Sequence, residues 1–136
     1  MISFVDRISI RSKSETEVVD ITNNVQDIVR RSNVKHGQVT IYTGHTTAAI
    51  ILNEYENGLI QDIVNLMELV VPKNKNYLHN RVDINAHSHL RAILIGTSKV
   101  IPIVDGAPTL GEWQRVMFIE LDGPRSRSVT IQVIGE

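Results

Sequence analysis

Three of the chain's five histidines lie in one short polar segment, between residues 79 and 89. They are His79, His87 and His89, and Asp83 and Asn85 lie between them. Random scatter would place about 0.4 histidines in a window of that length, so the cluster needs an explanation. Because neutral imidazole is a common ligand of Zn²⁺ and titrates closest to neutral pH, the segment indicates either a metal site or proton transfer. The alternative is a set of ordinary surface or hydrogen-bonding histidines.

His45 is a candidate for the third ligand of such a metal site. It lies at the start of a nearly continuous apolar segment, residues 46–52, which is predicted to be a buried strand. A catalytic Zn²⁺ has three protein ligands and one open position, which His45, His79 and His89 could provide. His87 and His89 would share one face of a strand, whereas on a helix their directions differ by about 200°. Since this segment is predicted to enter a helix, we expect only one of the two to bind the metal.

Asp83 and Asn85 are candidates for contacts to substrate or to a histidine ring. A carboxylate such as that of Asp83 can accept a ring N–H and so fix which ring nitrogen is free to bind a metal. The competing interpretation is that both residues form turns or cap the helix that follows.

Glu54 is a candidate general acid or base, and Asn53 beside it is a candidate substrate contact. Glu54 lies nine residues beyond His45, which is about 30 Å along a straight extended strand. The two residues therefore cannot share a small site unless the chain folds back or a second subunit completes the site. The simpler alternative is a solvated glutamate at the start of a helix, where the helix dipole favours a negative charge.

A further group of candidates lies in the C-terminal part of the chain. Trp113 and Gln114 begin a predicted strand, and Glu120 falls on the same alternating face as Gln114, so Glu120 is a second candidate general acid or base. Arg125 and Arg127 bracket a turn and could bind phosphate through paired hydrogen bonds. A core strand with polar ends, followed by a surface turn, would use the same residues.

Hydrophobic periodicity and turn residues predict strands that alternate with helices. A capping-box pattern at residues 14–17 predicts the start of the first helix, Pro102 predicts an edge strand, and residues 122–125 predict a hairpin-like connection. This order favours an α+β fold with a mostly antiparallel β-sandwich and about three helices over a doubly wound parallel sheet. The predicted strands cover residues 2–11, 39–42, 46–52, 100–104, 113–121 and 128–134, and the predicted helices cover residues 14–37, 59–70 and 85–95.

The whole-chain composition narrows the classes of function. The 136 residues suggest a single domain, residues 1–136, and the net charge of −1 argues against nucleic acid as a partner. Absence of cysteine excludes disulfides and thiolate metal sites. No apolar stretch is typical of a signal peptide or a membrane span, so a soluble, cytoplasmic protein with no membrane partner is expected. Neither of the glycine-rich nucleotide-binding motifs is present.

The chain resembles the YjbQ-like family, which is also described as the secondary thiamin-phosphate synthase family. The resemblance covers nearly the whole chain, and its motifs are specific in combination. They are His45-Thr46-Thr47-Ala48-Ala49, Asn53-Glu54, Tyr77-x-His79, Ala86-x3-Leu90 around His89, Gly96, Ile101-Pro102-Ile103, Leu110-Gly111-x-Trp113-Gln114 and Glu120-Leu121-Asp122-Gly123-Pro124-Arg125.

The resemblance implies an α+β sandwich that assembles as a homotrimer and has a histidine-lined pocket. The pocket is expected to bind a divalent metal, with Zn²⁺ favoured and Mg²⁺ as the alternative. The histidines that match the family pattern are His45, His79 and His89, whereas His87 is a departure from that pattern. A small phosphorylated molecule is the expected substrate.

The activity that the resemblance implies is a transferase reaction, in which a pyrimidine-methyl pyrophosphate is joined to a thiazole phosphate and pyrophosphate is released. The chain has no Asp-rich Mg²⁺ motif and no P-loop, so a side activity is one interpretation of this reaction, and the native reaction is then a different one. One alternative is a metal-assisted hydrolase of a phosphate ester or a lactone, and another is a non-catalytic trimer held together by its histidines. The expected roles are general acid or base for Glu54 or Glu120, and substrate binding for Asn53, Asp83, Asn85, Trp113, Gln114 and Arg125.

Overall fold

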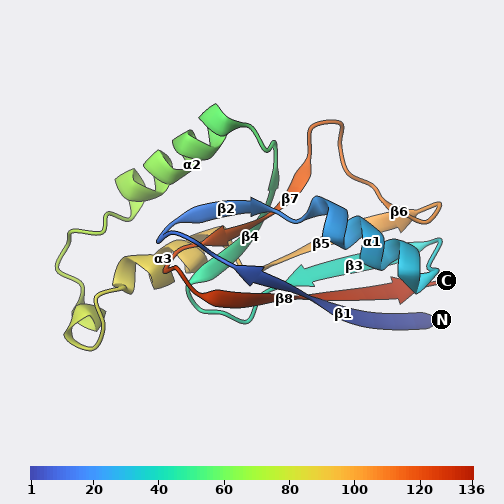
Figure 1. Ribbon diagram of the computed structural model, residues 1–136, viewed down its shortest axis with the longest axis horizontal. Helices are drawn as coiled ribbons and strands as arrows, with labels where there is room; N and C mark the ends of the chain where they lie inside the picture. The colour runs from blue at the N-terminus through green and yellow to red at the C-terminus, as the bar shows by residue number, and fades with distance from the viewer.

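A computed structural model describes all residues 1–136, and strands outnumber helices along the chain (Figure 1). The strands are β1 (Ile2–Arg11), β2 (Glu17–Asp20), β3 (Gly37–Tyr42), β4 (Ala48–Asn53), β5 (Ser98–Val104), β6 (Ala107–Pro108), β7 (Arg115–Glu120) and β8 (Ser126–Gly135). The helices are α1 (Thr22–Ser32), α2 (Asn57–Val70) and α3 (Ala86–Ile95), with a short 3₁₀ helix η1 (Leu78–Arg81) between α2 and α3.

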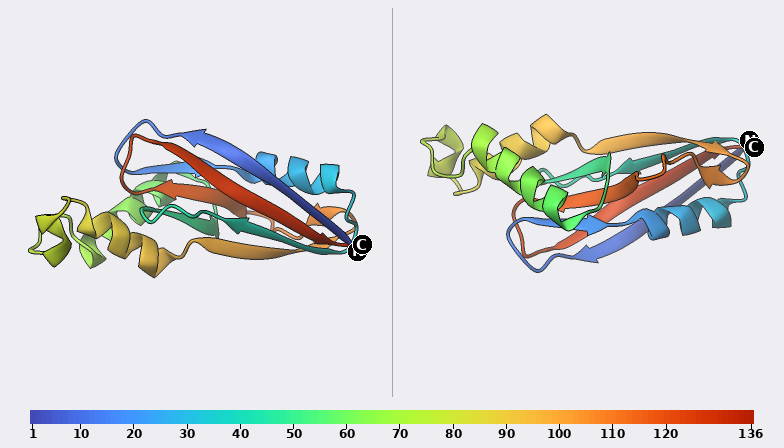
Figure 2. Two further views of the ribbon diagram at one scale, coloured as in Figure 1. Left: turned by 90° about the horizontal axis from the view of Figure 1, so that it is seen from below. Right: turned by 90° about the horizontal axis from the view of Figure 1, so that it is seen from above.

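The strands form two antiparallel sheets, which confirms the predicted α+β class. One sheet has five strands in the order β1-β8-β3-β5-β6, and the other has three in the order β2-β7-β4. All strand pairs are antiparallel, from β1 against β8 to β4 against β7. The segment containing η1 and α3 lies at one end of the molecule, and both chain termini lie at the other (Figure 2).

The main core lies between the two sheets and is built from alternating apolar side chains. Phe118 of β7, Ile50 of β4 and Ile131 of β8 are fully buried in it. Helix α1 contributes the apolar stripe that includes Val25 and Val29, so α1 covers one side of the sandwich. The five-stranded sheet therefore has one buried and one outward face, as alternation predicts.

A second core lies on the other face of the three-stranded sheet, under α2 and α3. Ala49, Met117 and Ile119 are buried there, and Met67 of α2 and Ala92 of α3 pack against them. Met67 is the only buried residue of α2, so much of that helix remains exposed. The three-stranded sheet is thus covered on both faces, which explains the nearly continuous apolar run in β4.

The predicted start of the first helix was wrong. Residues Glu17–Asp20 form β2, which pairs with β7, and α1 begins only at Thr22. The β-branched pair Val18 and Val19 favours a strand, and the Asp20 carboxylate accepts hydrogen bonds from the Thr22 amide at 3.0 Å and hydroxyl at 2.6 Å. Tertiary pairing and this turn therefore overrode the capping-box spacing.

Pro102 lies close to the edge that was predicted for its strand. On its outer side β5 pairs only with the two-residue β6, at Ile103 and Val104. The proline at this position therefore removes no donor from a central ladder.

None of the helices is both long enough and apolar enough to cross a membrane.

The predicted hairpin at residues 122–125 was also wrong. β7 belongs to the three-stranded sheet and β8 to the five-stranded sheet, so this connection passes between sheets. Gly123 is required there, because an added Cβ would lie only 2.4 Å from the Ser14 carbonyl oxygen. Sequence alternation correctly identified both strands but carried no information about which sheet each would join.

A buried ion pair joins the two sheets just before and after this crossing. Glu120 of β7 has no exposed surface and accepts hydrogen bonds from the Arg127 guanidinium of β8, one of them at 2.8 Å. The Ser12 hydroxyl donates to the same carboxylate at 2.6 Å, and Arg127 also donates to the Thr47 hydroxyl at 2.8 Å. Every polar atom of the pair therefore has a partner, as burial of charge requires.

The hydrogen bonds determine the ionisation of Glu120. Burial raises its pKa, but the hydrogen bonds from Arg127, Ser12 and the Asp122 amide lower it, and the net pKa lies below the ordinary value. Glu120 is therefore ionised at neutral pH and provides the negative charge that buried Arg127 needs.

We predict that Arg127→Met destabilises the fold by about 3–5 kcal/mol, because it leaves the Glu120 carboxylate buried without its counter-charge. Replacing both partners, as Glu120→Leu with Arg127→Met, should recover most of that loss. Urea unfolding of each variant measures the change in the free energy of unfolding. Arg30→Met, which removes an exposed ion pair with Asp27, is the matched control. A loss in Arg127→Met no larger than in the control would contradict the assigned role.

Candidate histidine site

His89 lies between two hollows that together contain the three histidines of the predicted metal site. One hollow, of about 350 Å³, is lined by His45 from the β3–β4 loop and by His89 and Ile93 of α3. The other, of about 460 Å³, is lined by His79 of η1, His89 and Leu90. The fold thus brings His45, a residue far from the others in sequence, to the same surface as His79 and His89.

His79 and His89 are direct neighbours. Their ring centroids lie 4.8 Å apart at an interplanar angle of 73°. Neither residue is fully buried, so both rings are accessible from solvent. Two of the three predicted metal ligands are therefore in direct contact.

A chain of hydrogen bonds fixes the orientation of the His79 ring. The Asn85 amide group donates to the Asp122 carboxylate at 2.8 Å, so the Asn85 carbonyl oxygen is turned toward His79. That oxygen lies 3.0 Å from His79 Nε2, which must therefore carry the proton. Arg125 in turn donates to the Asp122 carboxylate at 3.0 Å. The free lone pair of His79 is consequently on Nδ1.

Asn85 performs the task that the sequence suggested for Asp83. Asn85 is buried at the N-cap position of α3, yet its side chain makes no capping hydrogen bond. Asp83 is exposed, and only its backbone amide has an assigned partner, the His79 carbonyl oxygen. The alternative interpretation of Asn85 as a helix cap is therefore wrong, because its amide links His79 to Asp122.

His45 is held by a backbone group. The Ser128 amide donates to His45 Nε2 at 3.0 Å, so in the neutral ring the proton is on Nδ1. Burial and the positive charge of Arg127 lower the pKa of His45, and the charge of Glu120 opposes this effect only in part. His45 is therefore neutral at neutral pH, which is the form that a metal binds.

The three histidines do not converge on one point within a single chain. No group of three or more histidine or carboxylate side chains is arranged to hold a metal ion. His79 and His89 have the chemistry of Zn²⁺ ligands and are adjacent, whereas His45 Nε2 is already engaged by Ser128. One chain therefore has two adjacent histidines and a third histidine across the first hollow.

His87 lies apart from the other histidines. Its side chain is buried and its Nε2 is 3.5 Å from the Glu15 carboxylate in the β1–β2 connection. Burial and the charge of Arg91 lower the pKa of His87. Both histidines lie on α3, and of the two only His89 lines the hollows. That only one of the pair binds a metal stays a prediction.

Glu120 and Arg127 lie behind His45 rather than in either hollow. Glu120 has no surface with which to contact a substrate, and Arg127 is nearly as buried. The sequence expectation that Glu120 acts as general acid or base, and that Arg127 binds phosphate, therefore needs correction. Their pairing leaves them a positioning role, which the sequence did not reveal because their partners Ser12 and Thr47 are about 80–108 residues away along the chain.

The remaining candidates lie at the opposite end of β4 and β7. Ala48 pairs with Glu120 at the histidine end, and Asn53 pairs with Arg115 at the other end. β4 spans about 17 Å between these ends. Glu54 follows Asn53 directly, and Trp113 and Gln114 directly precede β7 (Figure 1). As the sequence predicted for a straight strand, His45 and Glu54 do not meet within one chain.

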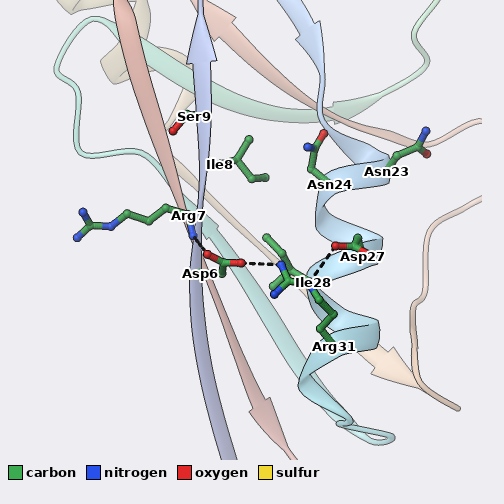
Figure 3. A pocket seen from close by; sticks show the side chains of 9 residues that line it. All are labelled: Asp6, Arg7, Ile8, Ser9, Asn23, Asn24, Asp27, Ile28 and Arg31. Carbon is green, nitrogen blue, oxygen red and sulfur yellow. Dashed lines mark hydrogen bonds and ion pairs between the residues drawn. The ribbon is translucent and has the colours of Figure 1, made fainter.

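A polar groove of about 380 Å³ between β1 and α1 contains none of the predicted site residues. Figure 3 shows the Asp6 carboxylate accepting hydrogen bonds from the Arg7 amide at 2.8 Å and from Arg31 at 2.6 Å. Arg31 also pairs with Asp27 at 3.0 Å along α1, as their spacing permits. These contacts link the helix to the first strand, and the groove plays no part in the histidine site.

Comparison with known proteins gives consistent results over nearly the whole chain. The family model described as UPF0047 protein YjbQ-like matches residues 6–136. A UPF0047 protein of Archaeoglobus fulgidus is 42% identical over 127 residues, which cover 93% of this chain and 98% of the relative. One of Methanothermobacter thermautotrophicus is 38% identical over 133 residues, covering 98% and 93%.

Solved structures of similar proteins have the same fold. A crystal structure of a YbjQ-like protein of unknown function from Sulfolobus solfataricus is 38% identical, with a TM-score of 0.97 and 98% coverage of both chains. An uncharacterised YjbQ/UPF0047 protein from Clostridium acetobutylicum is 37% identical, with a TM-score of 0.91 and coverage of 95% of this chain and 99% of that one. The chain therefore belongs to the YjbQ-like family, UPF0047.

Proposed function

We propose that this protein is a small metal-dependent enzyme that joins a pyrimidine-methyl pyrophosphate to a thiazole phosphate, as a main or a side reaction. The observation that carries the proposal is the adjacent pair His79 and His89, with the proton of His79 held on Nε2 by Asn85. A metal-binding histidine typically donates its other ring nitrogen to such a partner. The reaction itself follows from the family resemblance.

The metal ligands in this proposal are His79, His89 and His45. An all-nitrogen set suits Zn²⁺ better than Mg²⁺, which prefers oxygen ligands. When bound, the metal supplies positive charge to stabilise the pyrophosphate leaving group. His45 joins the set if its ring turns away from the Ser128 amide, or it binds substrate from across the first hollow.

The chain's own residues supply the other parts of the proposed site. Arg125 is half-exposed and already aligned by the Asp122 carboxylate, so its remaining donors are available to a phosphate oxygen. Tyr77 and Leu90 line the hollow next to His79 and His89 and offer an apolar wall for a substrate ring. Glu54 is the proposed general acid or base, because Glu120 is fully buried.

The proposed assembly is a homotrimer. Exposed apolar residues line the histidine hollows, namely Leu78, Leu90 and Ile93. An apolar surface of this kind around a site is typical of an interface between subunits. We propose no membrane partner and no nucleic-acid partner, in keeping with the net charge of −1.

The activity test distinguishes coupling from hydrolysis. We predict that the metal-loaded protein releases pyrophosphate only when both organic substrates are present, because the coupling needs a nucleophile from the second one. Pyrophosphate release and product mass measure the reaction. Activity on single phosphate esters or lactones, without need for a second substrate, would instead identify a hydrolase. Inactivity on both panels, with the metal bound, would leave only a binding role.

We predict that His89→Ala abolishes stoichiometric Zn²⁺ uptake, because His89 is the residue shared by both hollows. Elemental analysis after equilibrium with excess metal gives the stoichiometry. His36→Ala, which removes an exposed histidine after α1, is the matched control and should bind as the unaltered protein does. Equal stoichiometry in both variants would overturn the assignment of the metal site.

We predict that Asn85→Ala weakens Zn²⁺ binding by roughly 10- to 100-fold, the usual effect of removing the residue that orients a metal-binding histidine. The ring of His79 would then be free to exchange its proton between nitrogens. Competition with a chelator of known affinity measures the change. The control is Asn76→Ala in the exposed loop after α2, which should leave the affinity unchanged.

A further inference from the structure

Asn57 is the only asparagine of the chain that is followed directly by glycine. The pair Asn57-Gly58 begins α2, where the chain has left β4 (Figure 1). Both residues are exposed to solvent. Because glycine has no Cβ, nothing hinders the approach of its backbone nitrogen to the asparagine side chain before it. This pair therefore differs chemically from every other asparagine of the chain and its successor.

The reaction open to this pair is an intramolecular ring closure. The backbone nitrogen of Gly58 loses its proton and attacks Cγ of Asn57, and the side-chain nitrogen leaves as ammonia. Water then opens the cyclic imide at one of its two carbonyl groups. One opening gives aspartate, and the other gives isoaspartate, in which the main chain runs through the former side chain. Water is the only co-reactant, and no electrons are transferred.

The Glu56 carboxylate holds the nitrogen that has to attack. Glu56 is the N-cap of α2, and its side chain accepts hydrogen bonds from the Gly58 amide at 2.6 Å and the Leu59 amide at 3.0 Å. These hydrogen bonds lower the pKa of Glu56, so the cap is ionised at neutral pH. While the cap persists, the Gly58 amide keeps its proton and Asn57 keeps its helical backbone. Ring closure therefore requires the first turn of α2 to open.

The absent side chain of Gly58 serves the cap and also creates the reactive pair. A Cβ added there would lie 3.1 and 3.2 Å from the two carboxylate oxygens of Glu56. These distances are shorter than ordinary van der Waals contact, so a larger residue would push the carboxylate away from the amide. The close cap and the unhindered nitrogen thus have the same origin.

We propose that Asn57 is a modification site, at which the side-chain amide is converted to aspartate and isoaspartate through a cyclic imide with Gly58. The Glu56 cap sets the rate of this conversion, because the reactive conformation forms only when the cap is open. The modification depends on the time that the folded protein spends in water, and it needs no second protein.

Two other asparagines show why exposure or backbone freedom alone is not enough. Asn33 has a left-handed backbone with φ of 62° at the end of α1, but the β-branched Val34 follows it. Asn76 lies exposed in the loop after α2, but the aromatic Tyr77 follows it. In both pairs the side chain of the second residue hinders attack by its own nitrogen. These two positions are internal references for the rate at Asn57.

The two products differ in their effect on α2. Aspartate adds a negative charge to the first turn, where the helix dipole favours it. Isoaspartate lengthens the main chain within that turn and interrupts the helical repeat directly after the cap. It therefore weakens the anchor of the connection that carries Glu54, the proposed general acid or base. This consequence rests on the proposed function, whereas the modification itself does not.

Peptide mapping by mass spectrometry tests the rate. When the folded full-length protein is incubated at neutral pH, the peptide with Asn57 should gain the mass of an amide-to-acid conversion faster than the peptides with Asn33 and Asn76. Glu56→Ala should accelerate the conversion by roughly 5-fold, the effect of removing a typical N-cap on the opening of a turn. Glu56→Gln, which keeps one acceptor oxygen, should accelerate it less. Glu112→Ala, at an exposed glutamate before β7, is the matched control and should leave the rate unchanged.

Transfer of labelled methyl groups by an isoaspartyl methyltransferase identifies the product. The unaltered protein should accept more label with time of incubation. Asn57→Gln retains an amide but closes a ring only slowly, so it should remove this increase. Any label that remains in Asn57→Gln comes from the aspartate-glycine pairs at Asp105 and Asp122, which convert without a change in mass.

Each outcome supports or overturns the inference. Conversion at Asn57 no faster than at Asn76 would overturn the site, and equal rates in Glu56→Ala and Glu112→Ala would overturn its control by the cap. A mass gain without new methyl-accepting groups would overturn the formation of isoaspartate. None of these measurements uses a metal or a substrate. Failure of Zn²⁺ uptake would therefore refute the proposed enzyme and leave the modification site in place.

Discussion

The ion pair of Glu120 and Arg127 is the interaction on which the arrangement of the two sheets and of His45 depends. Both groups are buried, so each is stable only in the presence of the other. Their hydrogen bonds to Ser12 and Thr47 join the β1–β2 connection, the β3–β4 loop, β7 and β8 at one place. The residue after Arg127 is Ser128, whose amide holds the His45 ring, so the same contact that joins the sheets also positions the site.

A second network begins where the first ends. The Asp122 amide donates to the Glu120 carboxylate at 3.0 Å, and the Asp122 side chain accepts from Asn85, which holds His79. His45 and His79 therefore both depend on the segment from Asp122 to Ser128, His45 through the Ser128 amide in β8 and His79 through side chains. The protonated ring nitrogen differs between them, Nδ1 in His45 and Nε2 in His79. The hydrogen bonds of the fold thus determine which ring nitrogen of each histidine carries the proton.

Local patterns predicted most of the elements, and long-range pairing decided the rest. Alternation identified β1, β7 and β8, and the helical stripe of α2 was found near its true bounds. The segment Glu17–Asp20 was misassigned, because β2 exists only through its pairing with β7. The histidine cluster indicated the surface on which His45, His79 and His89 line two adjoining hollows. The buried role of Glu120 could not be predicted, since nothing local shows that a strand's terminal carboxylate will face an arginine from another sheet.

The rigidity of the sandwich keeps the histidine end and the opposite end of β4 and β7 apart. β4 and β7 are held in register along their whole length, so the two ends of the pair cannot approach each other. Loops could be rearranged at small cost, but a paired strand can be shortened only by breaking its ladder. Polar and aromatic residues at both ends can therefore act together only across an interface.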